Sequence, residues 1–205
     1  FNKEINSLED YKGLKIRMPG LGGEVLRRIG AAAVSLPGGE IMPALQSGAI
    51  DATEWVGPWN DLAFGFYKVT KYYYYPGFHE PGTALGSGVN LDVWNSLTSD
   101  QQSLIATCMA AENNVTLAEF NARNGAALNT LLTDHGVQLK KFSSEILQAI
   151  GEAAGEVVAE AGATDAMTQK IYNSFIDFRS KAIGWSKLSD QAYWNARILP
   201  FKYGS

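Results

Sequence analysis

The sequence has one cysteine, no block of basic charge and no long apolar run. The single thiol, Cys108, excludes an intrachain disulfide and a cysteine metal site, and it leaves the redox compartment undetermined. The net charge is -4 and no basic run is longer than Arg27-Arg28, so we expect no nucleic-acid partner. No apolar run approaches the roughly 20 residues that a membrane-spanning helix needs.

The common enzyme motifs are also missing. The sequence contains no nucleophile motif that combines Ser, His and Asp, no HExxH motif and no cofactor fingerprint. The glycine-rich segment at residues 20–23 lacks the spacing of a nucleotide site and is interpreted as a turn and helix cap. The sequence begins at Phe1 without an initiator Met and without a signal-peptide apolar region, so we expect a processed protein or a part of a longer one.

Apolar residues are plentiful, at 46% of 205 residues, which suffices for one good-sized core or two small ones. Up to residue 90, short β-like runs alternate with helical stretches, a pattern typical of a mostly parallel α/β sheet. The predicted strands lie at residues 14–18, 32–36, 50–55, 71–75 and 83–90. The predicted helices between them lie at residues 24–29, 39–47 and 59–69.

The pattern becomes helical at Thr98, which forms a predicted capping box with Gln101. The helical periodicity continues until Gly136, and about 38 residues at 1.5 Å each would make a rod of about 57 Å. Such a helix must either kink or cross two lobes. A short predicted strand follows at residues 137–142.

A second helical region begins at Ser143 or Ser144 and ends in an aromatic tail. The large rings of this tail are Trp185, Tyr193, Trp194 and Phe201. They exceed what a solvated chain end needs, so we predict an intermolecular contact and a homodimer through the C-terminal helix. A helical interaction module is the alternative interpretation of the same segment.

Three charged side chains could carry chemistry. Arg17 ends a predicted strand before Pro19, where a guanidinium could hold a carboxylate through two parallel hydrogen bonds; a surface arginine is the alternative. Glu54 and Glu80 each follow a β-like run beside proline and glycine, and their oxygens suit a hard cation such as Na⁺ or Ca²⁺. Two solvated glutamates, or a general acid and base of an enzyme, are the alternatives.

Two aromatic residues flank these glutamates. Trp55 and Phe78 would provide an apolar wall for a small ligand, although core packing explains them equally well. His79 is interpreted as a hydrogen-bonded loop residue, and His135 as a charge that complements a helix C-terminus.

Four segments in order resemble the core signature of TRAP (tripartite ATP-independent periplasmic) transporter solute receptors. They are DYKGLKIRMP at residues 10–19, IGA at 29–31, PGGE at 37–40 and ALQSGAID at 44–51. Two further segments look like the branch of this family that binds 2-oxo or 2-hydroxy monocarboxylates with a metal ion. These are ATEWVGP at residues 52–58 and YYPGFHEPG at 74–82.

The resemblance implies a type II periplasmic-binding-protein fold of class α/β, with two lobes joined by crossing strands and a long helix. Family members carry well over a hundred residues upstream, so most of the first lobe would be missing here. Residues 1–53 and 89–205 are then expected in the second lobe, and residues 54–88 in the hinge-crossing part of the first. A further glutamine-type metal ligand would come from the upstream part.

The resemblance also implies roles for individual residues. Arg17 would anchor the ligand carboxylate, with Trp55, Phe78 and Glu80 around the ligand. Glu54, Glu80 and the backbone carbonyl of Trp55 would bind Na⁺ or Ca²⁺. The implied function is a periplasmic receptor that delivers a pyruvate- or lactate-like acid to a TRAP membrane permease. Turnover of the acid would instead indicate a metal-dependent enzyme that uses Glu54 and Glu80.

Overall fold

The computed structural model describes residues 1–80, 82 and 85–202. The chain divides into two compact units, Phe1–Ala153 and Ala154–Ser205. This division is by compactness, and the partition into receptor lobes predicted from the resemblance stays a prediction.

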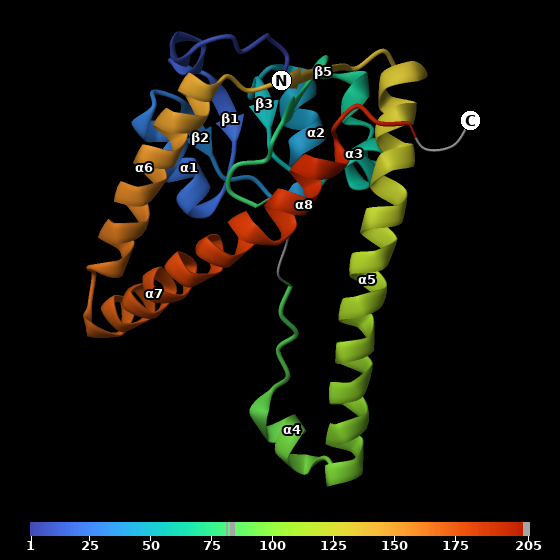
Figure 1. The fold of residues 1–205 in the computed structure, drawn as a ribbon, viewed down its shortest axis with the longest axis vertical. Helices are drawn as coiled ribbons and strands as arrows, with labels where there is room; N and C mark the ends of the chain where they lie inside the picture. Colours follow the sequence, from blue (N-terminus) through green and yellow to red (C-terminus); the bar gives the residue numbers. More distant parts are fainter. Residues whose placement is uncertain (81, 83–84, 203–205) are drawn as a thin grey trace. The chain divides into compact units, whose positions relative to one another are not determined.

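The first unit begins with a 3-10 turn, η1 (Leu8–Tyr11), and is built on a parallel three-stranded sheet. Its strands are β1 (Lys15–Arg17), β2 (Ala32–Val34) and β3 (Ala52–Thr53), in the order β2-β1-β3. Helix α1 (Gly20–Arg28) links β1 to β2, and α2 (Gly38–Ser47) links β2 to β3 (Figure 1). The predicted alternation of parallel strands and helices is confirmed. The carboxyl ends of β1 and β3 therefore meet at the same edge of the sheet.

Apolar side chains from the sheet and its two helices form the core of this unit. The largest fully buried members are Tyr11, Leu14, Ile16, Leu26, Ile41 and Ile50, with Ile146 from a later helix. Gly23 sets how closely α1 approaches the end of β1, because a Cβ there would lie 2.3 Å from the carbonyl oxygen of Met18. This close approach places α1 directly beside the strand end that carries Arg17.

The helix predicted at residues 59–69 is interrupted. The structure has α3 (Pro58–Phe64) followed by a 3-10 turn, η2 (Phe66–Lys68). Gly65 separates them with a φ of 76°, and its N–H donates to the carbonyls of Asp61 and Leu62. A left-handed glycine of this kind ends an α-helix, because it turns the backbone away while it satisfies the last carbonyls.

A second parallel pair is formed by β4 (Tyr72–Tyr75) and β5 (Gln138–Lys141), which confirms the strands predicted there. The strand predicted at residues 83–90 is wrong for residues 85–90, which are in no regular element. Residues 83 and 84 lie outside the described residues. Gly86 and Gly88 explain the difference, because glycine weakens a strand interior and offers no side chain to pack.

The short helix α4 (Leu91–Ser96) precedes the long α5 (Ser99–Thr133). The capping box between Thr98 and Gln101 is present. The 35 residues of α5 correspond to about 52 Å, and the helix is continuous without the kink that was one of two expectations. Its C-terminal part contacts α3, where Asn124 accepts a hydrogen bond of 3.0 Å from the backbone N–H of Trp59. Its N-terminal end lies beside α4, far from the sheets (Figure 1).

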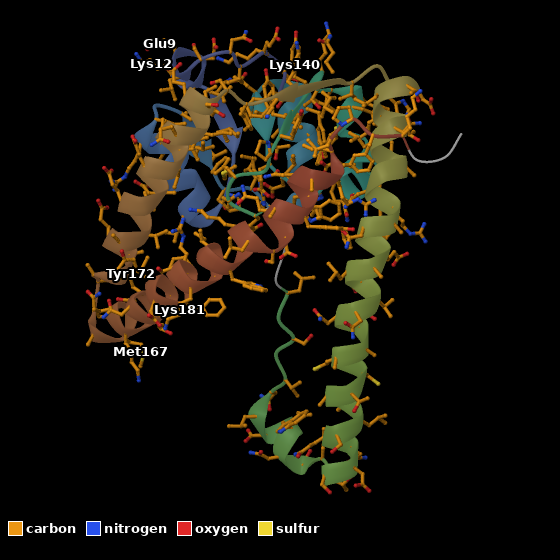
Figure 2. The ribbon with its side chains drawn as sticks, in the orientation of Figure 1. Glu9, Lys12, Lys140, Met167, Tyr172 and Lys181 are labelled. Atoms are coloured by element: carbon orange, nitrogen blue, oxygen red, sulfur yellow. The ribbon has the colours of Figure 1, made fainter. Side chains whose placement is uncertain are left out.

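Three helices complete the chain, namely α6 (Ser144–Gly162), α7 (Ala166–Leu188) and α8 (Asp190–Arg197). Ser143 accepts a hydrogen bond from the N–H of Ile146 at the start of α6, as the serine pair predicted. Within the second unit, Gly162 lies against Tyr172, which Figure 2 labels, and a Cβ there would come within 2.5 Å of that side chain. Among the described residues, none of the helices is both long and apolar enough to cross a membrane.

Candidate functional site

The candidate site begins at the carboxyl ends of β1 and β3. Arg17 is the last residue of β1, and Glu54 follows β3 directly. The N–H of Glu54 donates to the carbonyl of Arg17 at 3.1 Å, so the parallel register holds the two residues side by side. Arg17 is only 8% exposed.

Arg17 is held by three groups. Its Nε donates to the carbonyl of Leu36 at 3.1 Å, and its Nη1 donates to the backbone carbonyl of Glu54 at 3.3 Å. Nη1 also forms an ion pair of 3.2 Å with Oε2 of Glu54. The guanidinium is thus fixed in orientation by backbone oxygens and neutralised by one carboxylate.

Trp55 lies over this ion pair. The guanidinium carbon of Arg17 is 5.3 Å from the centre of the indole ring, within the range of a cation–π interaction. The ring also packs on Gly38 at the start of α2, where a Cβ would lie 2.7 Å from the ring atom Cη2. Glycine at this position therefore makes room for the indole.

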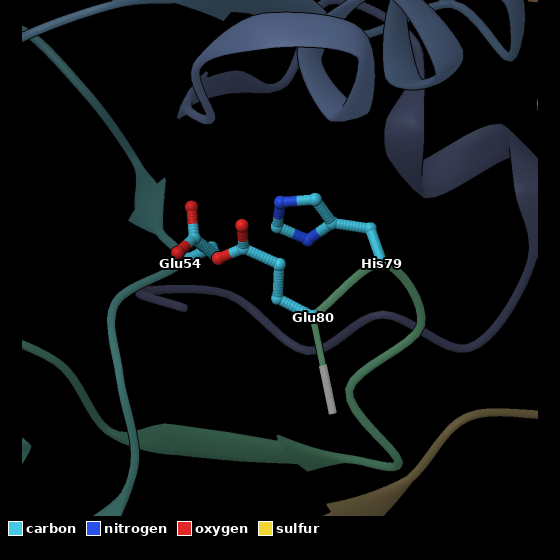
Figure 3. Close-up of side chains that lie close together, drawn as sticks. All are labelled: Glu54, His79 and Glu80. Carbon is cyan, nitrogen blue, oxygen red and sulfur yellow. The ribbon is translucent and has the colours of Figure 1, made fainter. Parts of the chain in front are cut away.

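Glu80 and His79 reach the same place from the loop after β4. One carboxylate oxygen of Glu54, one of Glu80 and one ring nitrogen of His79 all lie within 4.8 Å of one another (Figure 3). The structure thus brings together Glu54 and Glu80, as the sequence predicted. It adds His79, which the sequence analysis interpreted only as a loop residue; its position directly before Glu80 was the available signal.

These residues border a pocket of about 550 Å³ in the first unit. Glu54, Trp55, Phe78 and Glu80 line it, together with the four tyrosines of β4. Arg17 does not line the pocket but contacts Glu54 and Trp55, which do. A pocket of this size with an apolar wall and a few converging charges is typical of a small-molecule site.

Burial controls the protonation of the site. It raises the pKa of Glu54 to about 7; the Arg17 guanidinium opposes this shift, and the Glu80 carboxylate adds to it. Burial also lowers the pKa of His79, against the opposing effect of Glu80. Two carboxyl groups and a neutral imidazole nitrogen therefore face one another near neutral pH. This donor set fits a metal cation, since a cation would relieve the repulsion between the two acids.

A second buried acid lies in the pocket wall and was missed by the sequence analysis. Asp61 of α3 is 8% exposed and accepts a hydrogen bond of 2.6 Å from the hydroxyl of Tyr73. Burial raises its pKa to about 6, and the bond from Tyr73 opposes the shift. The sequence signal was weak, because Asp61 looks like an ordinary polar residue of an amphipathic helix.

Comparison with known proteins identifies a family. Residues 1–165 match the DctP family, described as bacterial extracellular solute-binding protein, family 7. A monocarboxylate 2-oxoacid-binding periplasmic protein from Nostoc sp. is 42% identical over 195 residues, which are 95% of this chain and 53% of that relative.

Two solved structures share the fold. A TRAP periplasmic solute-binding protein from Colwellia psychrerythraea, with bound calcium and pyruvate, has a TM-score of 0.89 and 42% identity over 96% of this chain and 60% of that one. A second, from Pseudoalteromonas atlantica with bound sodium and pyruvate, has a TM-score of 0.87 and 36% identity over 98% and 60%. The predicted periplasmic-binding-protein fold is confirmed, and the chain spans little more than half the length of these relatives.

Proposed function

The chain belongs to the DctP family of bacterial extracellular solute-binding proteins, and we propose that it forms part of a TRAP receptor for a small 2-oxo or 2-hydroxy monocarboxylate, bound together with a cation. The observation that carries the proposal is that Glu54 and Glu80 meet at one pocket while Arg17 is paired with Glu54. Two negative groups at a pocket wall, one of them paired with a guanidinium, suit a ligand that brings a carboxylate and shares a cation. The relatives with bound pyruvate support the ligand class.

Arg17 is the proposed anchor of the ligand carboxylate. Its guanidinium is held by the backbone carbonyls of Leu36 and Glu54, so little side-chain freedom is lost when a second carboxylate binds. In the structure Glu54 pairs with the same Nη1 atom. A ligand carboxylate therefore competes with Glu54 unless another positive charge engages Glu54.

The proposed cation supplies that charge. Glu54 and Glu80 would hold it, with the backbone carbonyl of Trp55 as a further oxygen ligand, and Na⁺ and Ca²⁺ are the ions that prefer such donors. Two like charges about 4 Å apart repel by about 4 kcal/mol at an effective dielectric near 20. A bound cation offsets this repulsion and makes the pocket acceptable to an anionic ligand.

Trp55 and Phe78 are the proposed apolar wall for the alkyl end of the acid, since both line the pocket beside the glutamates. Because the family is defined by solute binding, Glu54 and Glu80 act in binding rather than as a general acid and base of an enzyme.

The proposal extends to the receptor as a whole. Residues 1–53 and 89–205 would belong to the second lobe, and residues 54–88 to the hinge-crossing part of the first. The crossing segment is supported by β4, which lies in a different sheet from β1 to β3. The receptor would act in the periplasm, deliver its ligand to a TRAP membrane permease and dimerise through the C-terminal helices. Their many exposed rings support the last point.

Calorimetry tests the proposed function. Pyruvate is titrated into the chain at pH 7.5, with Ca²⁺, with Na⁺, and after chelation with sodium replaced. The same series uses the chain joined to the portion of the Nostoc relative that it does not match. Pyruvate binding is expected only with a cation. Glu54→Gln or Glu80→Gln should abolish this cation-dependent binding. Glu119→Gln in α5, which does not line the pocket, is the matched control. Equal pyruvate affinity in cation-free buffer would contradict the proposal.

A further inference from the structure

The imidazole of His79 is positioned by a close contact with α1. A Cβ on Gly22 would lie 2.8 Å from Cδ2 and 3.2 Å from Cγ of His79, so the carbon edge of the ring packs against a position that only glycine leaves open. Figure 3 shows the opposite edge of the ring toward the carboxylates of Glu80 and Glu54. A merely solvated loop histidine needs no such cleared position.

The resulting donor set is richer than a hard cation requires. Na⁺ and Ca²⁺ take oxygen ligands, for which the two glutamates and a backbone carbonyl suffice. An imidazole nitrogen with carboxylate oxygens is instead the donor set of Zn²⁺ and of the neighbouring transition metals.

The spacing is close to what a single ion needs. Two ligand atoms of one tetrahedral Zn²⁺ ion lie about 3.3–3.6 Å apart, because each is about 2.0–2.2 Å from the metal. The three donor atoms of Glu54, His79 and Glu80 lie within 4.8 Å. Rotation of the two glutamate side chains, which are attached through flexible methylene groups, would bring the donor atoms to this spacing.

We propose that His79 makes this a mixed-donor site, in which Glu54, His79 and Glu80 bind Zn²⁺ in competition with the hard cation. The inference rests on the proposed function only in that both use Glu54 and Glu80. The regulatory consequence is that a transition-metal dication changes the occupancy of the site without any change in the 2-oxo acid.

Metal titration of the chelator-treated 205-residue chain tests the assignment. Removal of even an outer-shell partner weakens metal binding by about 10- to 100-fold, so His79→Gln is expected to weaken Zn²⁺ binding at least about tenfold more than it weakens Ca²⁺ binding. His135→Gln is the matched control, because His135 stacks on Tyr67 at 3.7 Å and does not line the pocket. Equal loss of both metals in His79→Gln, or none, overturns the proposal.

A spectroscopic measurement covers the case in which His79→Gln does not fold. The sequence contains two histidines, so His135→Gln leaves His79 as the last imidazole. Pulsed electron paramagnetic resonance of Cu²⁺ bound to His135→Gln is expected to show a coordinated imidazole that one equivalent of Zn²⁺ weakens. A spectrum without imidazole coordination refutes the role of His79.

The two proposals fail separately. If pyruvate does not bind in the presence of calcium but the imidazole coordination is observed, the receptor function is contradicted and the mixed-donor site is supported. If pyruvate binds but no imidazole coordination is observed, the receptor function is supported and the mixed-donor site is contradicted.

Discussion

Arg17 and Glu54 neutralise one another across 3.2 Å in the structure, so the guanidinium is already committed to one carboxylate. Arg17→Lys should fail as an anchor, because an ammonium cannot reproduce two parallel hydrogen bonds. Loss of a buried charge-assisted pair costs about 2–5 kcal/mol, which corresponds to at least about a thirtyfold loss of affinity. Calorimetry with pyruvate at saturating Ca²⁺ measures it. Arg123→Lys, at an exposed position of α5 outside the pocket, is the control. Near-native affinity of Arg17→Lys would refute the anchor.

Asp61 should make stability depend on pH. Its folded pKa of about 6 lies above the ordinary 3.8, so the folded chain binds more protons and stability falls as pH rises from about 4 to about 6. A difference of about two between the folded and ordinary pKa values changes the free energy of unfolding by at most about 3 kcal/mol. Asp61→Asn should flatten this part of the profile in urea unfolding, whereas the exposed Asp134→Asn should not. A further fall up to about pH 7 is expected from Glu54, whose pKa is also raised. An unchanged slope between pH 4 and 6 in Asp61→Asn would rule out Asp61 as its source.

At the scale of elements, the contact between α1 and the end of β1 depends on Gly23. A Cβ there would lie 2.3 Å from the backbone oxygen of Met18, which cannot move without shifting the strand end. Gly23→Ala should therefore destabilise the fold by about 1–3 kcal/mol, as overpacking does. Gly39→Ala in α2 has nothing within 4 Å and should be neutral or stabilising, by up to about 1 kcal/mol. Urea unfolding compares the two variants, and equal stability would contradict the close contact.

At the scale of the whole molecule, the C-terminal helices are the proposed dimer contact. No residue of α7 or α8 is buried, and Trp185 is 69% and Trp194 61% exposed. Met167 also projects outward from α7 (Figure 2). A chain ending at Gly184 should sediment as a monomer and the complete chain as a dimer, because large exposed rings favour association.

The control for this prediction keeps the apolar residues. Lys181→Gln with Asp177→Asn removes an exposed ion pair of α7 and should leave the dimer intact. The same mass for the truncated and complete chains would show that the aromatic tail does not mediate assembly.

Much of the fold follows from local sequence. The capping box at Thr98, the serine pair that begins α6 and the β-like runs of β1 to β5 act over a few residues, so they are visible in the chain itself. The resemblance of residues 10–82 to TRAP receptors located Arg17, Glu54, Trp55 and Glu80. Local pattern failed at residues 85–90, where alternation suggested a strand but the chain there pairs with no neighbour, and at Gly65, whose left-handed backbone ends α3.

The sequence by itself therefore determined the parallel α/β class, the starts of α5 and α6 at their caps and the residue types available for binding a carboxylate and a cation. The start of α1 was not among these, because Gly20–Gly23 belong to the helix rather than to a turn before it. Only the tertiary structure decided that Arg17 pairs with Glu54, that Tyr73 donates to Asp61, and that Gly22 leaves the space for the His79 ring near Glu54. The reason is physical. Secondary structure depends on neighbours a few residues apart, whereas these contacts join elements through sheet register and helix packing, which no local pattern records.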